Sequence, residues 1–211
     1  MSAGRARWGF HQLGRSWAAR VVADAGIRAG DLVLDVGAGT GALTAPLVDC
    51  GARVVAIERH LGRAAELRQK FAADDVTVVL ADALDLRLPR RPFRVVSNPP
   101  FSVTVALLRR LVAPGSRLER ADIVVPWHTA RRWAAADAPG ARRWLRDFEV
   151  GIGRALPRSA LSPPPPNGVA ILVLARRTPR GQQSRFPLTG HGANATRDSK
   201  PAAVRPACIR D

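Results

Sequence analysis

Sulfur, lysine and tyrosine are scarce in this chain. Its 211 residues include 2 cysteines, 1 methionine and no tyrosine, and lysine occurs only at Lys70 and Lys200. The cysteines, Cys50 and Cys208, are too few for a framework of several disulfides and lack the close spacing of a metal-binding cluster. The sequence therefore excludes small disulfide-rich domains and predicts no metal site.

Long apolar runs are also missing. No stretch is long enough to span or anchor in a bilayer, so we expect no membrane association. Residues 1–15 are basic and lack the apolar segment of a secretory signal. A cytoplasmic protein is therefore expected.

Acidic residues are outnumbered throughout the chain. Asp and Glu total 17 against 33 for Lys and Arg, which gives a formal net charge of +16 at pH 7. The excess is spread along the chain, so the folded body should attract polyanions, with nucleic acid as the first candidate. Arginine suits phosphate contacts and base stacking. A GC-rich genome would also favour arginine over lysine, but it would not explain the net charge.

Short apolar strands alternate with helices in most of the chain. This alternation predicts an α/β fold with a parallel, doubly wound sheet that is covered on both faces. The expected strands are 32–34, 54–57, 76–80, 93–96, 121–125 and 168–174, and the expected helices are 17–25, 42–48, 60–71 and 103–112, with short basic helices at 129–136 and 141–145.

The length fits one domain with two extensions. Residues 1–15 read as an irregular basic arm, and residues 16–177 hold the alternating pattern. Residues 178–211 are rich in Gly, Pro, Ser, Thr, Asn and Arg and have little apolar periodicity, which predicts a disordered basic tail.

Three glycines, Gly37, Gly39 and Gly41, lie between a predicted strand and a predicted helix. Glycine permits a tight turn and a close approach of backbone to ligand, and the helix start offers free N–H groups. The Gly-Lys-Ser/Thr of a phosphate-binding P-loop is absent, and the third glycine comes one residue too early for the dinucleotide fingerprint. The loop predicts a cofactor site, with a purely structural turn as the alternative.

Acidic residues close the next two strands. Glu58 ends the second strand about 20 residues after the loop, where a carboxylate can accept both ribose hydroxyls. Asp82 follows the third strand, beside the expected adenine position. Either residue alone fits a solvated strand end. Because ligands bind at the carboxyl ends of strands in such sheets, the loop and both acids together predict one nucleotide-cofactor site.

Residues 98–101 read Asn-Pro-Pro-Phe and follow the fourth strand, about sixty residues after the glycine loop. The Asn98 side-chain oxygen and the Pro99 carbonyl can accept the N–H groups of a planar amine and favour its pyramidal transition state. Phe101 can stack on an extruded base. A plain Asn-Pro turn is the alternative. Beside a cofactor site, the motif predicts an amine-directed methyltransferase that uses S-adenosylmethionine.

Other candidate groups carry less information. His11, His60, His128 and His191 have neither metal-ligand nor triad spacing. The mixture of Arg and Trp at 127–133 fits RNA contact, and it equally fits an amphipathic helix with Trp packed inward. Both interpretations stay open at this point.

These motifs resemble the Erm-type 23S rRNA adenine-N6 methyltransferases over about residues 7–177. The resemblance rests on residues 35–44, 56–58, 82–83 and 98–101. It implies a Rossmann-like class I methyltransferase fold, with a seven-stranded, mostly parallel sheet whose last strand is antiparallel. It further implies S-adenosyl-L-methionine as cofactor, 23S rRNA as partner, and resistance to macrolides, lincosamides and streptogramin B. No protein partner is implied, and a monomer is the default expectation.

The resemblance also assigns site residues. Catalysis would fall on Asn98, Pro99 and Phe101, and cofactor binding on His11, Leu13, Gly37, Ala38, Gly39, Glu58, Asp82, Ala83 and Asn98. Gly37 would hold the carboxylate end of the cofactor, Glu58 the ribose and Asp82 the adenine.

The chain departs from the family pattern in three places. His11 stands where the family has an asparagine, and residues 124–128 stand where most relatives carry a Gln-Arg pair. The helical C-terminal domain of typical members is not expected here, because the motif-bearing part ends near Arg177. RNA recognition is then expected from the basic arm, the Arg/Trp helices and the tail.

Four other functions remain in view. The same motif logic fits an adenine-N6 methyltransferase of 16S rRNA or of DNA. A methyltransferase of protein glutamine fits poorly with a charge of +16. A catalytically idle rRNA-binding or ribosome-assembly factor would bind rRNA in a salt-sensitive way and ignore S-adenosylmethionine.

Overall fold

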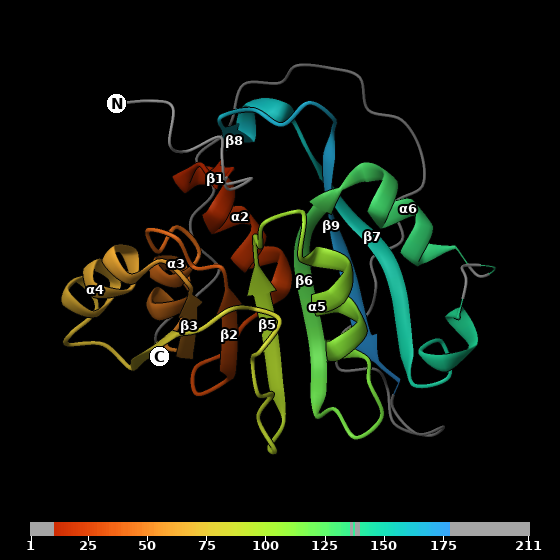
Figure 1. Ribbon diagram of the computed structural model, residues 1–211, viewed down its shortest axis with the longest axis horizontal. Helices are drawn as coiled ribbons and strands as arrows, with labels where there is room; N and C mark the ends of the chain where they lie inside the picture. Colours follow the sequence, from red (N-terminus) through yellow and green to blue (C-terminus); the bar gives the residue numbers. More distant parts are fainter. Residues whose placement is uncertain (1–10, 136, 138–139, 178–211) are drawn as a thin grey trace.

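The computed structural model describes residues 11–135, 137 and 140–177, which form one large sheet with helices on both faces (Figure 1). The sheet has 7 strands in the order β4-β3-β2-β5-β6-β9-β7. Their bounds are β2 Leu32–Val36, β3 Arg53–Glu58, β4 Val76–Leu80, β5 Phe93–Ser97, β6 Leu118–Pro126, β7 Phe148–Leu156 and β9 Val169–Arg176.

The strand directions agree with the predicted fold class. Strands β2 to β6 pair in parallel, whereas β9 is antiparallel to both β6 and β7. The predicted α/β class, with a seven-stranded, mostly parallel sheet and an antiparallel last strand, is therefore confirmed.

Helices cover the two faces of the sheet in separate groups. Buried side chains of α2, α3 and α4 pack on one face, and those of α5, α6 and the 3-10 turn η1 pack on the other. None of the helices in the described ranges is long and apolar enough to cross a membrane. The bounds are α2 Arg15–Ala25, α3 Thr44–Asp49, α4 Leu61–Lys70, α5 Thr104–Leu111, α6 Trp127–Ala134 and η1 Ala141–Arg143.

A second, two-stranded sheet joins the start of the described chain to the segment before β9. Strand β1 (Gln12–Leu13) pairs antiparallel with β8 (Leu161–Ser162), which follows the 3-10 turn η2 (Arg158–Ala160). Gln12 also donates a hydrogen bond to the Thr40 hydroxyl at 2.9 Å. Residues 12–13 of the predicted arm thus pack on the body. Residues 1–10 and the predicted tail at 178–211 lie outside the described residues.

Strand β7 is one of the strands, with the two-residue β1 and β8, that the sequence pattern did not predict. It is an edge strand that pairs only with β9, and its register is irregular between Ile152 and Ala155. Gly151, Gly153 and Arg154 interrupt its apolar pattern, and only its ends are fully buried. Because glycine and arginine weaken a strand signal, residues 148–156 were not predicted as a strand.

Buried arginines tie helix α2 to the sheet. Arg94, only 1% exposed, lies on β5 and donates to the carbonyl of Gly26 at 2.8 Å and to Asp31 at 2.9 Å. Arg120 on β6 pairs with Asp122 at 2.7 Å. These cations lie at the carboxyl end of α2, where they complement the helix dipole.

Candidate functional site

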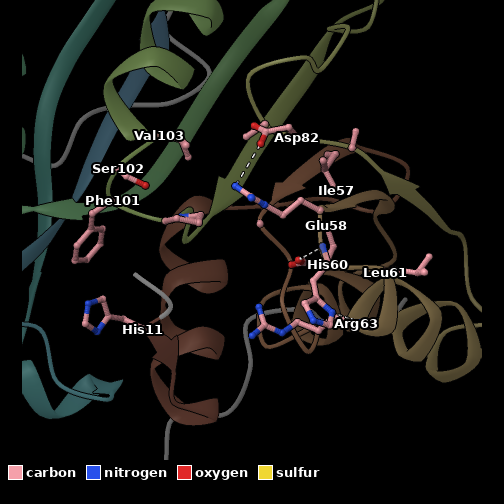
Figure 2. Close-up of a pocket in the computed structure, with 15 residues that line it drawn as sticks. His11, Ile57, Glu58, His60, Leu61, Arg63, Asp82, Phe101, Ser102 and Val103 are labelled. Carbon is pink, nitrogen blue, oxygen red and sulfur yellow. Dashed lines mark hydrogen bonds and ion pairs between the residues drawn. The ribbon is translucent and has the colours of Figure 1, made fainter. Parts of the chain in front are cut away.

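The carboxyl ends of β2, β3, β4 and β5 meet at one edge of the sheet, and a cavity of about 540 Å³ opens there (Figure 2). A cavity of this volume falls within the range of small-molecule and cofactor sites. The structure thus brings together predicted residues from five separate parts of the chain. Those that line the cavity are His11, Gly37, Glu58, Asp82, Ala83 and Phe101.

The glycine loop touches the Asn-Pro-Pro-Phe motif directly. Gly37 has φ +77°, and a Cβ atom there would lie 3.1 Å from Pro100 Cδ and 3.3 Å from Pro99 Cα. The loop is also fastened to β3, since the N–H of Gly37 donates to the Ile57 carbonyl at 2.8 Å. Only glycine fits this conformation together with this close approach.

Glu58 is buried beneath the loop, and each of its carboxylate oxygens accepts one hydrogen bond from a main-chain N–H. Its Oε2 accepts the Gly39 N–H at 2.9 Å, and its Oε1 accepts the His60 N–H at 2.8 Å. A carboxylate oxygen has two acceptor positions, so each oxygen keeps one for a further donor. Because Glu58 also lines the cavity, a pair of ribose hydroxyls is a suitable further partner.

Asp82 lines the same cavity. Its Oδ1 accepts the Leu84 N–H at 2.9 Å, and its Oδ2 lies 3.4 Å from the Arg59 guanidinium. This ion pair is the dashed line at Asp82 in Figure 2. Sequence reasoning missed Arg59, which also lines the cavity and has no distinguishing motif of its own.

The side-chain amide of Asn98 has a hydrogen-bond partner for its nitrogen and none, among the described residues, for its oxygen. Its Nδ2 donates to the main-chain carbonyl of His11 at 2.7 Å, which sets the orientation of the amide. Its Oδ1 is buried and accepts no hydrogen bond from the described part of the chain. Buried acceptors without partners are rare, and each calls for an explanation, of which a function in binding or catalysis is one. Asn98 lines a smaller cavity of about 20 Å³, together with Leu13, Gly37 and Ala38.

Phe101 and His11 form the aromatic end of the large cavity. Their rings stack with centroids 5.3 Å apart and an interplanar angle of 26°, and His11 Nδ1 lies 2.7 Å from the Pro163 carbonyl oxygen. In Figure 2 these rings lie opposite Glu58 and Asp82. The cavity therefore has an aromatic end, and its opposite side carries the carboxylates of Glu58 and Asp82 together with Arg59 and Arg63.

Two predicted residues line neither cavity. The N–H of Gly39 is taken by Glu58, and Pro99 is buried against Gly37. Their predicted functions, like those of the other site residues, stay predictions.

Asp35 is a residue that sequence reasoning quoted in the loop motif without giving it a function. It is 1% exposed, lines the smaller cavity and accepts a hydrogen bond from the Thr44 hydroxyl at 2.8 Å. Burial raises the pKa of Asp35 to about 7, the hydrogen bond from Thr44 opposes the rise, and the charge of Glu58 adds to it. Residues 35–44, on which the family resemblance partly rests, begin with Asp35 and end with Thr44, and this was the available signal.

We expect the Asp35→Asn variant to reveal this raised pKa as a pH-dependent difference in stability. Above the unfolded-state value of 3.8 the unfolded chain releases the proton of Asp35, while the folded chain retains it up to about pH 7. The folded state then binds more protons, so the free energy of unfolding of the wild type falls with rising pH across that window. The full effect is at most about 4 kcal/mol.

Denaturant unfolding from about pH 4 to about pH 8 measures the difference between wild type and Asp35→Asn. The free energy of unfolding of the wild type minus that of Asp35→Asn should fall with rising pH and level off above the folded-state pKa of Asp35. The Thr44→Val variant removes the hydrogen bond that lowers the pKa of Asp35, so in that background the fall should begin at the same pH and extend to a higher one. A pH-independent difference would contradict the raised pKa.

Comparison with known proteins assigns the chain to a family. The ribosomal RNA adenine dimethylase family matches residues 2–186. The rRNA adenine N-6-methyltransferase of Corynebacterium diphtheriae is 35% identical over 146 residues, covering 68% of this chain and 57% of that protein. The mycinamicin-resistance protein MyrB of Micromonospora griseorubida is 37% identical over 150 residues, covering 69% and 47%. The chain thus spans about half the length of these curated relatives.

A third relative and a solved structure extend the comparison. Ribosomal RNA small subunit methyltransferase A of Anaeromyxobacter dehalogenans is 34% identical over 204 residues, covering 85% of this chain and 71% of that protein. The crystal structure of the 23S rRNA methyltransferase ErmE superposes with a TM-score of 0.71 at 29% identity, covering 80% of this chain and 70% of ErmE. The chain belongs to the ribosomal RNA adenine dimethylase family and has the Rossmann-like fold of the S-adenosylmethionine-dependent methyltransferases.

Proposed function

We propose that this chain transfers a methyl group from S-adenosylmethionine to the exocyclic N6 of an adenine in ribosomal RNA. One observation carries the proposal. The buried Oδ1 of Asn98 lacks a donor in the described part of the chain, and Asn98 lies between the glycine loop and the aromatic end of the cavity. An amine hydrogen of the target base would supply the missing donor.

The residues at the site fit this cofactor. The free acceptor positions of Glu58 suit the ribose hydroxyls, and Asp82 with Ala83 forms the wall expected for the adenine. Gly37 lines both cavities, so the methionine part would lie beside it, whereas the smaller cavity, which Ala38 and Leu13 also line, has room for about one water molecule. When bound, S-adenosylmethionine supplies an electrophilic methyl group on a sulfonium. The protein has to bind and orient this cofactor and the target adenine, and it has to exclude water from the site.

Asn98 would favour the reacting geometry of the target nitrogen. The nitrogen lone pair of adenine is delocalised into the ring, which makes the amine a poor nucleophile. An acceptor at Asn98 Oδ1, with a second at the Pro99 carbonyl, stabilises the pyramidal nitrogen of the transition state. No general base is needed, because the proton can leave to water after transfer.

His11 would help in two ways. Its main-chain carbonyl holds the Nδ2 of Asn98, so that Oδ1 is left for the target amine. Its ring stacks on Phe101 and so widens the aromatic wall on which an extruded adenine would lie. The strand pair β1–β8 and the Gln12–Thr40 hydrogen bond support His11 at this position.

We further propose 23S rRNA as the substrate, a monomer as the active form, and resistance to macrolides, lincosamides and streptogramin B as the consequence. The similarity to MyrB and to ErmE supports this choice. A small-subunit target is the second candidate, because the relative of that description matches 85% of this chain. Ribosomal RNA as substrate is consistent with the predicted cytoplasmic location.

Purified protein incubated with tritiated S-adenosylmethionine and protein-free 23S rRNA, 16S rRNA or duplex DNA tests the proposal. We expect label in 23S rRNA, mapped by primer extension to one adenine, with mass spectrometry to count the methyl groups. Label in 16S rRNA or DNA would retain the chemistry and change the substrate. RNA binding without label, and without cofactor binding in calorimetry, would favour an idle rRNA-binding factor.

A further inference from the structure

The exposed side of helix α6 is made only of aromatic and basic side chains. Thr129, Ala130 and Trp133 are buried, and Trp133 stacks on Trp144 with ring centroids 4.6 Å apart. The interpretation with Trp packed inward therefore holds for Trp133, whereas Trp127 is 40% exposed and RNA contact by this segment stays a prediction. We call the exposed residues Trp127, His128, Arg131 and Arg132 the α6 face.

The α6 face lies at the same edge of the sheet as the candidate site. Strands β5 and β6 are parallel neighbours with Ser97 opposite Ile123. Asn98 directly follows Ser97, and Trp127 comes four residues after Ile123. With about 3.3 Å per residue and 4.8 Å between strands, Trp127 starts α6 roughly 10 Å beyond Asn98. Figure 1 shows α6 leading away from that end of β6.

The position of Trp127 is held by the fold. Its main-chain N–H donates to the Gly168 carbonyl at 2.9 Å, just before β9 begins. Pro126, which ends β6 and precedes the helix, restricts the backbone at the same point. An indole on a rigid backbone offers a large stacking surface with little loss of conformational entropy.

We infer that the α6 face binds the nucleotide next to the target adenine in single-stranded RNA, an inference that rests on the proposed function. Trp127 stacks on the base of that nucleotide, and Arg131 contacts its phosphate. Stacking on an exposed aromatic side chain tolerates any base, and guanidinium groups suit phosphate geometry. Extruding one base leaves the next one unstacked and in need of a new partner. The net charge of +16 complements this polyanion.

A fluorescence experiment on the full chain tests the inference without methyl transfer. The probe is a short single-stranded RNA with one adenine flanked on both sides by 2-aminopurine, whose fluorescence is quenched by stacking. We expect quenching by the wild type and by Trp127→Phe, which keeps an aromatic ring. Trp127→Ala should lose the quenching and raise the Kd about 5- to 100-fold.

Arginine variants separate phosphate contact from general charge. Arg131→Ala should weaken binding and reduce the slope of log Kd against log salt by about 1. Arg117→Ala is the matched control. Arg117 is also exposed, but it precedes β6 and so lies at the end of that strand that is far from α6. This variant should bind like the wild type and show an unchanged salt slope.

The outcomes distinguish this inference from the proposed function. Quenching that depends on Trp127 supports the inference even if no rRNA is methylated. Methylated rRNA together with unchanged quenching, Kd and KM in Trp127→Ala would overturn the inference and leave the proposed function in place. Failure of the wild type to bind the probe would also overturn it, as would self-association of the chain that Trp127→Ala abolishes.

Discussion

Asn98→Ala is expected to slow methyl transfer to ribosomal RNA strongly while the cofactor site remains formed. The variant removes the buried Oδ1 acceptor that lies free for the target amine and also the Nδ2 donor to the His11 carbonyl. Loss of one preorganised group aimed at a transition state costs about 100- to 1000-fold in kcat. Single-turnover kinetics with saturating cofactor measure this loss. The Kd for S-adenosylmethionine, from calorimetry, should change much less.

Two further variants separate the functions of the Asn98 amide. Asn98→Asp retains oxygen acceptors but cannot donate to the His11 carbonyl, so it should recover part of the rate if the acceptor matters most. Ser97→Ala is the matched control, because the neighbouring Ser97 also has a buried oxygen without a partner among the described residues. That variant should fold and react like the wild type. Equal rates for Asn98→Ala and the wild type would remove Asn98 from the mechanism.

The fold was predictable wherever strands are buried on both faces. The predicted strands 93–96 and 121–125 lie within β5 and β6, and Phe93, Val95 and Ile123 are at most 1% exposed. Continuous apolar runs of this kind identify central strands of a parallel sheet. The glycine loop, Glu58 and Asp82 lie at the carboxyl ends of the predicted strands 32–34, 54–57 and 76–80, so a parallel topology alone placed them at one edge.

Elements defined by tertiary contacts were not predictable. Strand β1 has two residues, and its pairing with β8 joins positions about 150 apart, which no local pattern records. The middle of β7 is only partly buried, so its sequence alternates weakly. Arg94 is a charged residue in a central strand, and its burial depends on the α2 carbonyls and on Asp31, which approach only in the folded chain.

The candidate site was predictable in its residues but not in its hydrogen bonds. The sequence placed Asn98 beside a cofactor loop, yet the amide orientation depends on the His11 carbonyl, 87 positions away in the chain. Likewise, the raised pKa of Asp35 follows from complete burial next to Thr44 and Glu58. A motif gives residue types and spacing, whereas desolvation and donor positions come from packing.

Gly37→Ala should damage cofactor binding and catalysis together. A methyl group at Gly37 would lie 3.1 Å from Pro100 Cδ and 3.3 Å from Pro99 Cα, so the loop and the Asn-Pro-Pro-Phe turn would have to move apart. A misplacement of 1 Å can cost about 100-fold in rate, so a shift of a few tenths of an ångström should cost roughly 10-fold. Calorimetry and single-turnover kinetics should show both losses.

Backbone strain alone would not explain these losses, and Gly115→Ala provides the control. Gly115 has φ +80°, close to the +77° of Gly37, but a Cβ atom there has no neighbour within 4 Å among the described residues. Both variants should therefore lose about 1–2 kcal/mol of stability from the left-handed conformation. Only Gly37→Ala should also lose cofactor affinity and rate. If Gly115→Ala lost them equally, the close contact between the loop and the prolines would have no function beyond folding.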